Sequence, residues 1–174
     1  WYLKEIITPN NQKISFAYNS FQQSFISSAS YNETYTSSCY SDGSFDRNPS
    51  SCRSINQTTS KALSSIYFGN NKIVFDYRTD RKDEGSLLLS NISVYNNTKL
   101  IKREELIYDE IYNNQKVQDS RLSLNPSIHY RYFLKEINNY DSSNIFQNKF
   151  SFDYYNLSSI PPRLSWNKDL YGYY

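Results

Sequence analysis

The sequence predicts an all-β fold built as an array of antiparallel β-hairpins, and three observations support this prediction. One phrase of similar residues recurs four times along the 174 residues. The chain holds 18 Tyr, 10 Phe and 2 Trp, and aromatic side chains favour half-buried strands. Asn-Asn pairs divide three of the four phrases, at points where a tight turn needs residues that tolerate positive φ. Repetition in a fixed phase is typical of units that bury their apolar faces against one another.

Each copy begins with a Leu-x-x-Ile motif and returns as an alternating strand. The first hairpin is expected over residues 1–19, from Leu3-x-x-Ile6 through Asn10-Asn11 to Ile14-x-Phe16-x-Tyr18. Alternation with a period of two residues predicts that Ile14, Phe16 and Tyr18 share one buried face. In a flat strand, Leu and Ile three positions apart would point to opposite faces. Either both faces are covered, or a β-bulge inserts one residue into the strand.

Three further copies follow residue 60. They predict hairpins over residues 61–78 (Leu63-x-x-Ile66 to Ile73-x-Phe75-x-Tyr77), 86–112 (Leu89-x-x-Ile92, Asn96-Asn97, to Tyr108) and 128–155 (Leu134-x-x-Ile137 to Phe150-x-Phe152-x-Tyr154). The second hairpin is expected to turn at Asn70-Asn71, and the fourth to have a longer polar loop. The face of Ile73, Phe75 and Tyr77 should be buried, and Phe152 and Tyr154 are also interpreted as core residues.

Residues 20–60 interrupt this rhythm with a stretch rich in Ser, Thr, Asn, Gln and Tyr. We interpret them as an insertion with short strands near 21–27 and 31–35, which divides the chain into regions 1–19, 20–60 and 61–174. Cys39 and Cys52 lie inside this insertion. A disulfide between them would close a loop of about a dozen residues and stabilise the fold by about 3 kcal/mol in the chain-entropy model. The alternative is a pair of free thiols. A disulfide would favour an oxidising, extracytoplasmic compartment.

Little in the sequence indicates catalysis. The net charge of +2 gives no electrostatic footprint for nucleic acid, and no apolar run is long enough for a membrane-spanning helix. The only histidine, His129, alternates with Arg131 and Phe133 and is interpreted as a strand-surface residue. One His and two Cys cannot build a closed zinc site without carboxylates, and no Gly-rich phosphate-binding loop is present. We therefore expect a non-enzymatic protein without metal or cofactor.

Paired carboxylates are the one pattern that could serve a hydrolase. Glycosidases need two acids at a fixed separation across the bond they cleave. Three adjacent pairs have the right residue types, namely Asp83-Glu84, Glu104-Glu105 and Asp109-Glu110. None lies in a distinctive setting, and a chain with 17 acidic residues offers such pairs by chance.

The ordered series of motifs resembles the large RHS/YD-repeat-like surface proteins of Bacteroidetes. The resemblance rests on the Leu-x-x-Ile and Phe-x-Tyr motifs above, with Tyr77-Arg78-x-Asp80, Arg121-Leu122-x-Leu124, Pro161-x-Arg163 and Asp169-x-Tyr171-Gly172-Tyr173-Tyr174. It covers nearly the whole chain outside residues 20–60. It implies an extended array of β-hairpins, secreted across the outer membrane to the cell surface. No strict Tyr-Asp-x-x-Gly-Arg-Leu repeat occurs, so neither the hollow shell nor the protease core of RHS toxins is carried over.

The leading hypothesis is a scaffold or casing segment of a large secreted or surface-anchored β-repeat protein. Its partners would be adjacent repeats or other subunits of a larger assembly. The sequence contains no Met, and we expect the chain to be a piece of a longer polypeptide. The alternatives are a glycan- or protein-binding adhesion module and an accessory shell segment of a toxin-delivery protein. A binding surface would use exposed aromatic side chains, for which the candidates are Tyr31, Tyr35, Tyr40, Trp166 and Tyr171.

Overall fold

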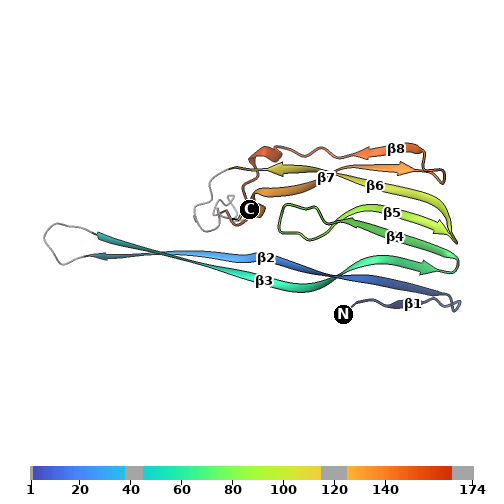
Figure 1. Cartoon of the computed structure of the whole chain (residues 1–174), viewed down its shortest axis with the longest axis horizontal. Helices are drawn as coiled ribbons and strands as arrows, with labels where there is room; N and C mark the ends of the chain where they lie inside the picture. Colours follow the sequence, from blue (N-terminus) through green and yellow to red (C-terminus); the bar gives the residue numbers. More distant parts are fainter. Residues whose placement is uncertain (1, 38–44, 115–124, 166–174) are drawn as a thin grey trace.

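The computed structural model describes residues 2–37, 45–114 and 125–165. Its strands form one antiparallel sheet of eight strands in the order β1 to β8, so every strand pairs with its neighbours along the chain (Figure 1). The all-β prediction is confirmed, and the antiparallel pairing agrees with an array of hairpins. In the described ranges no helix is long and apolar enough to cross a membrane.

The elements vary widely in length. The strands are β1 (Glu5–Ile7), β2 (Lys13–Ser37), β3 (Phe45–Phe68), β4 (Asn71–Arg78), β5 (Leu88–Asn96), β6 (Lys99–Tyr112), β7 (Tyr130–Tyr140) and β8 (Phe146–Ser151). Two single-turn 3₁₀ helices, η1 (Pro126–His129) and η2 (Leu157–Ser159), flank the last hairpin. The described residues therefore form a single-layer sheet, with only short helical turns beside it.

Residues 20–60 do not form the expected insertion with short strands of its own. They belong to two long strands, β2 of 25 residues and β3 of 24, which pair from Ile14 opposite Phe68 as far as Ser37 opposite Phe45. This hairpin projects well beyond the other strands (Figure 1). The sequence of residues 20–60 is rich in Ser, Thr, Asn and Gln, so these strands do not require an apolar covering layer on either face.

The expected disulfide is absent, because Cys52 is a free, exposed thiol in β3. Cys39 lies outside the described residues. The strand register gives the physical reason. Cys52 pairs with Ser30, seven residues from Ser37 at the end of β2 and hence about 23 Å away at 3.3 Å per residue. Cys39 follows Ser37 by two residues, which span at most about 7 Å, so a bond to Cys52 would require this hairpin to unpair.

The turns use residues that adopt the left-handed backbone region. Asn11, Gly69 and Asn97 have φ values of 59°, 56° and 50°. Phe68 pairs with Asn71 and Asn96 with Lys99, so the second and third hairpins turn at residues 69–70 and 97–98, one residue away from the Asn pairs that we predicted. Such two-residue turns require positive φ, which glycine and asparagine supply at least cost.

The Leu-x-x-Ile spacing is explained by a β-bulge. In β3 Tyr18 pairs with Leu63 and Ala17 with Ser65, so Ser64 is an extra residue without an opposite partner. The same shift leaves Ser90 extra in β5 and Lys135 extra in β7. In all three strands the extra residue directly follows the motif leucine. The bulge returns leucine and isoleucine to the same face of the sheet, which a flat strand would not allow.

Among the described residues, the two most deeply buried apolar side chains, Ile26 and Ile128, lie away from the repeated motifs. The faces of Ile14, Phe16 and Tyr18 and of Ile73, Phe75 and Tyr77 are half-buried, and Phe152 and Tyr154 are exposed, so the prediction that these rings form a closed core is wrong. A single layer cannot enclose them. The core is instead a small cluster at the base of the long hairpin, where Ile26 of β2 packs with Ile128 of η1 and Leu164.

Candidate interaction surfaces

Three equivalent junctions join the four hairpin units β1–β2, β3–β4, β5–β6 and β7–β8. At each junction the second strand of one unit pairs with the first strand of the next. The motif residues meet in the same register at each junction. Between β2 and β3, Phe16 lies opposite Ile66 and Tyr18 opposite Leu63. The corresponding pairs are Phe75–Ile92 and Tyr77–Leu89 between β4 and β5, and Leu106–Ile137 and Tyr108–Leu134 between β6 and β7. The bulge lies between the two pairs each time. Five of these six pairs are aromatic–aliphatic, and cross-strand pairs of that kind stabilise antiparallel sheets.

In three of the four units, the tyrosine of the second strand donates a hydrogen bond to the leucine carbonyl of the first strand. The hydroxyl of Tyr18 donates to the Leu3 carbonyl at 2.9 Å, that of Tyr77 to Leu63 at 2.9 Å, and that of Tyr154 to Leu134 at 2.8 Å. Leu63 and Leu134 directly precede a bulge that disturbs the regular ladder, and the tyrosine hydroxyl supplies their carbonyl with a donor. Burial raises the pKa of Tyr77, so this hydroxyl remains a hydrogen-bond donor.

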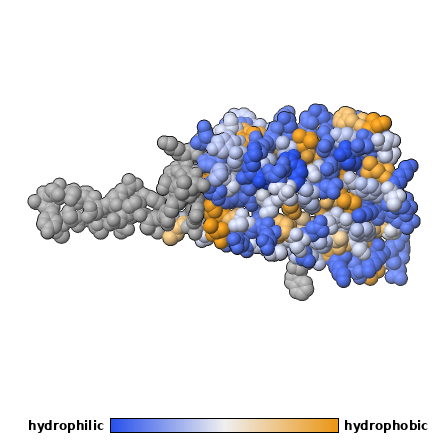
Figure 2. Space-filling view, viewed as in Figure 1, coloured by the Kyte–Doolittle hydropathy of each residue, from blue (hydrophilic) through white to orange (hydrophobic). Residues whose placement is uncertain are grey.

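The two outer strands expose the two halves of such a junction. Among the described residues no strand pairs with the outer edge of β8 or of β1. Beside β8, Phe152 and Tyr154 are 39% and 43% exposed, and beside β1, Leu3 and Ile6 are 52% and 41% exposed. Hydrophobic residues also gather where β7 turns into β8, at the upper right of Figure 2, and Ile145 and Phe146 of this turn are exposed. Unpaired apolar edges of this kind are templates for strand addition.

The base of the long hairpin holds a buried ion pair. The Glu84 side chain is almost fully buried, and its Oε1 accepts a hydrogen bond of 3.2 Å from the Ile26 N–H. Its Oε2 lies 3.0 Å from a guanidinium nitrogen of Arg163, an ion pair without hydrogen-bond alignment. The register shift at Ser27 interrupts the β2–β3 ladder beside Ile26. Glu84 thus joins β2, the β4–β5 connection and the segment after η2.

The connection between β4 and β5 is held by further charges. Arg81 and Asp83 form a two-bonded pair, with one bond of 2.7 Å from the Arg81 Nε, and Arg81 also donates to the Leu87 carbonyl. Lys82 and the Tyr132 hydroxyl both bind Glu110, each at 2.6 Å, and these bonds lower the pKa of Glu110. These contacts hold the charged run from residue 79 to 85, which we call the strap, against the neighbouring strands.

A cavity of about 630 Å³ lies beside this strap. Arg131, Tyr132, Pro161 and Arg163 are among its lining residues. The Arg131 guanidinium donates a 3.3 Å bond to the Pro161 carbonyl, while its buried Nε has no acceptor among the described residues. Burial, and then the charge of Arg163, lower the pKa of Arg131. The Asp83 carboxylate also lines this cavity, so its walls carry charges of both signs.

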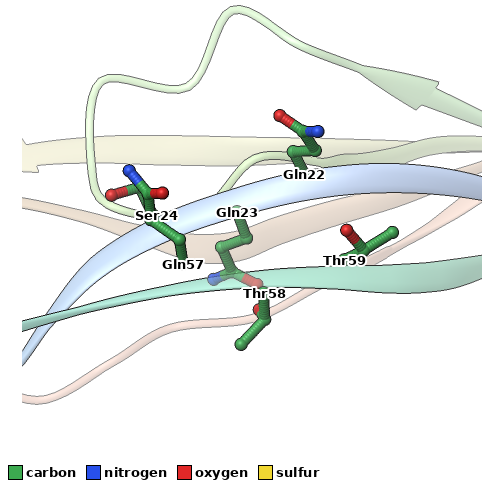
Figure 3. A pocket seen from close by; sticks show the side chains of 6 residues that line it. All are labelled: Gln22, Gln23, Ser24, Gln57, Thr58 and Thr59. Atoms are coloured by element: carbon green, nitrogen blue, oxygen red, sulfur yellow. The ribbon is translucent and has the colours of Figure 1, made fainter.

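A second cavity, of about 410 Å³, is lined by side chains of the two long strands (Figure 3). Its walls are neutral amide and hydroxyl side chains, namely Gln22, Gln23, Ser24, Gln57, Thr58 and Thr59. Successive strand residues point to opposite faces, and Figure 3 shows Gln22 and Gln23 extending to opposite sides of β2. The polar groups therefore do not converge on one point.

All three carboxylate pairs are engaged in contacts with other side chains. Asp83 binds Arg81 and Glu84 pairs with Arg163, while Glu110 binds Lys82 and Tyr132. Glu104 binds Lys102, Asp109 binds Lys135, and Glu105 accepts from the Tyr140 hydroxyl. Neighbouring strand residues point to opposite faces, which separates the members of the two strand pairs.

His129 differs from its predicted place on a strand surface. It is the last residue of η1 and is buried, with its Nδ1 2.6 Å from the Asn113 carbonyl. The Asn125-Pro126 start of η1 explains this, because Asn125 caps the turn by accepting from the Ser127 N–H. In the described ranges no group of three or more His, Cys, Asp or Glu side chains could hold a metal ion.

The predicted binding surface stays a prediction, because the described residues do not test it. The backbone of Tyr31 and Tyr35 lies in β2, opposite Ser51 and Arg47. Tyr40, Trp166 and Tyr171 lie outside the described residues. Sequence reasoning missed the junctions, although a signal was present. The Phe16-x-Tyr18 and Phe75-x-Tyr77 strands are each followed along the chain by the Leu-x-x-Ile strand that pairs with them.

Comparison with known proteins identified no relative of this chain. The chain matches no protein-family model, no curated protein and no solved structure.

Proposed function

We propose that this chain is a non-enzymatic scaffold segment of a β-hairpin array, joined edge to edge with neighbouring hairpins. The observation that carries the proposal is the junction, which occurs three times inside the sheet and is exposed as two complementary halves at its outer edges. In a repeat array each unit buries its apolar face against its neighbours, so an edge that ends in exposed Phe and Tyr is suited to receive another unit.

Two further features favour a structural role. The carboxylate pairs are bound to cations or hydroxyls, which leaves them poorly placed as a general acid and base. The strap and the buried Glu84 fix the base of the long hairpin, as a rigid scaffold requires. A place in a surface protein like the RHS/YD-repeat family rests on the sequence motifs alone, because the free Cys52 removes the internal argument for an oxidising compartment.

The directions of the backbone N–H groups along β8 allow association through its outer edge to be tested. The Phe152 N–H donates to the Lys135 carbonyl of β7 at 2.8 Å. N–H groups alternate sides along an antiparallel strand, so those of Phe150 and Asn148 also face β7. The N–H groups of Lys149 and Ser151 point away from β7, toward the open edge. A proline at position 149 would remove one outward donor and leave the bonds to β7 in place.

We expect the purified chain to associate through these edges, as measured by sedimentation velocity over a range of concentrations. Its mean mass should rise with concentration without settling at a fixed oligomer, because head-to-tail addition of strands leaves a free edge at each end unless a ring closes. Lys149→Pro should remain monomeric. Lys149→Ala is the matched control, since both variants lose the 2.7 Å ion pair with Glu136 but only proline loses the N–H. A wild-type chain that is monomeric at high concentration would contradict the proposal, as would equal association of the two variants.

A further inference from the structure

We infer that the outer edge of β8 binds an antiparallel Leu-x-x-Ile strand in one register, with the isoleucine opposite Phe152 and the leucine opposite Tyr154. A second copy of this chain supplies such a strand at its β1 edge. The inference rests on the proposed function and specifies its partner. It follows from three comparisons within the structure.

The first comparison concerns the receiving strand. The Phe150-x-Phe152-x-Tyr154 segment occupies the same place in its unit as Ile73-x-Phe75-x-Tyr77. Both tyrosine hydroxyls donate a hydrogen bond to the leucine carbonyl of the preceding strand, so the two segments make the same contact within their units. On its other side, Phe75 pairs with Ile92 and Tyr77 with Leu89. The outer side of β8 offers the same residues with no described strand opposite them.

The second comparison concerns the incoming strand. Leu3-Lys4-Glu5-Ile6 is identical to Leu134-Lys135-Glu136-Ile137. The latter segment docks on β6, with Leu134 opposite Tyr108 and Ile137 opposite Leu106. A strand of this sequence is therefore already seen on a Tyr-containing edge in the proposed register. The two units also share an internal ion pair, Glu5 with Lys13 at 2.6 Å and Glu136 with Lys149 at 2.7 Å.

The third comparison concerns the bulge. Lys135 is the extra residue of β7, and its ammonium binds Asp109 of the receiving strand at 2.9 Å. The equivalent residue beside β1 is Lys4, whose carbonyl accepts from the Phe16 N–H at 2.9 Å as the Lys135 carbonyl does from Phe152. On the side that faces β2, the segment around Lys4 therefore bonds as the Lys135 segment does on the side that faces β8, and its other side is left for a junction of the kind that β7 forms with β6.

Cross-linking tests the register. Phe152 and Ile6 would form a non-hydrogen-bonded pair, whose Cα atoms lie about 4.5 Å apart and within disulfide range. In a Cys39→Ser, Cys52→Ser background, Phe152→Cys and Ile6→Cys chains are mixed under mild oxidation, and the heterodimer is measured by mass spectrometry. We expect this pair to cross-link. The matched control, Phe152→Cys mixed with Ile7→Cys, should not, because Ile7 points to the opposite face.

The outcomes separate this inference from the proposed function. If the chains associate in sedimentation but the 152–6 pair does not cross-link, or the 152–7 pair cross-links equally well, the register is wrong while edge association stands. If neither variant nor the wild-type chain associates, the proposed function itself fails.

Discussion

Replacing Glu84 with alanine should lower the free energy of unfolding by about 3–5 kcal/mol, the range for removing one partner of a buried ion pair. The substitution removes the acceptor of the buried Ile26 N–H and leaves Arg163 without its carboxylate. Both losses fall at the base of the long hairpin, where β2, the β4–β5 strap and the segment after η2 meet. Urea unfolding followed by circular dichroism measures the effect.

The exposed pair of Glu136 and Lys149 provides the control. Its atoms lie 2.7 Å apart, closer than those of Glu84 and Arg163, but in contact with solvent. Glu136→Ala should therefore change stability by no more than about 1 kcal/mol. The double variant Glu84→Ala, Arg163→Ala should recover part of the loss, because it leaves no unpaired charge. A loss below about 1 kcal/mol for Glu84→Ala would show that the strap does not hold the hairpin base.

Ile128→Ala should lower stability by about 2–5 kcal/mol. Ile128 has no exposed surface and packs with Ile26 and Leu164. Truncation therefore leaves a cavity where three segments that are distant in the chain pack together. Its backbone carbonyl also accepts from the Arg163 N–H at 2.9 Å, which limits how far the site can collapse around the gap.

Ile101→Ala is the matched control for Ile128→Ala. Ile101 lies in β6 with nearly half of its surface in water, so the same truncation removes little buried area. It should cost about 1 kcal/mol or less by the area rule. Equal losses for the two variants would mean that the cluster of Ile26, Ile128 and Leu164 is not the core of the fold.

The repeated elements could be predicted from the sequence because their signals are local. Period-two alternation identified the second strands of the units, and turn residues placed the turns to within one residue. The odd Leu-x-x-Ile spacing admitted a bulge, which the structure confirms at Ser64, Ser90 and Lys135. These features depend on neighbouring residues and on the pleat of a strand, so they need no knowledge of the rest of the chain.

Other features could not be predicted because they depend on distant contacts. The core joins Ile26, Ile128 and Leu164, which share no periodic pattern. The buried carboxylate of Glu84 pairs with Arg163, which lies 79 residues later in the chain. No residue near Glu84 in the sequence distinguishes it from the other acidic residues of the charged run. The long hairpin was missed because a polar stretch without apolar alternation resembles a loop, although its Ser, Thr and Tyr residues are compatible with strands.

The junctions between hairpin units could be predicted only in part. Each half is a local motif, but their meeting depends on strand order, which the sequence implies only if consecutive strands pair. The aromatic residues Phe152 and Tyr154 were expected in a core because rings usually are buried. The junction register explains their exposure, since their equivalents Phe75 and Tyr77 face a further strand on that side.

Amide hydrogen exchange along β8 tests the central claim, that this sheet grows by adding strands at its edges, most directly. In dilute solution the N–H groups of Lys149 and Ser151 should exchange rapidly, whereas that of Phe150, directed at β7, should be protected. As the protein concentration rises, exchange at Lys149 and Ser151 should slow in step with association, and exchange at Phe150 should change little. Association with unchanged rapid exchange at Lys149 and Ser151 would contradict the account, because the chains would then be meeting through another surface.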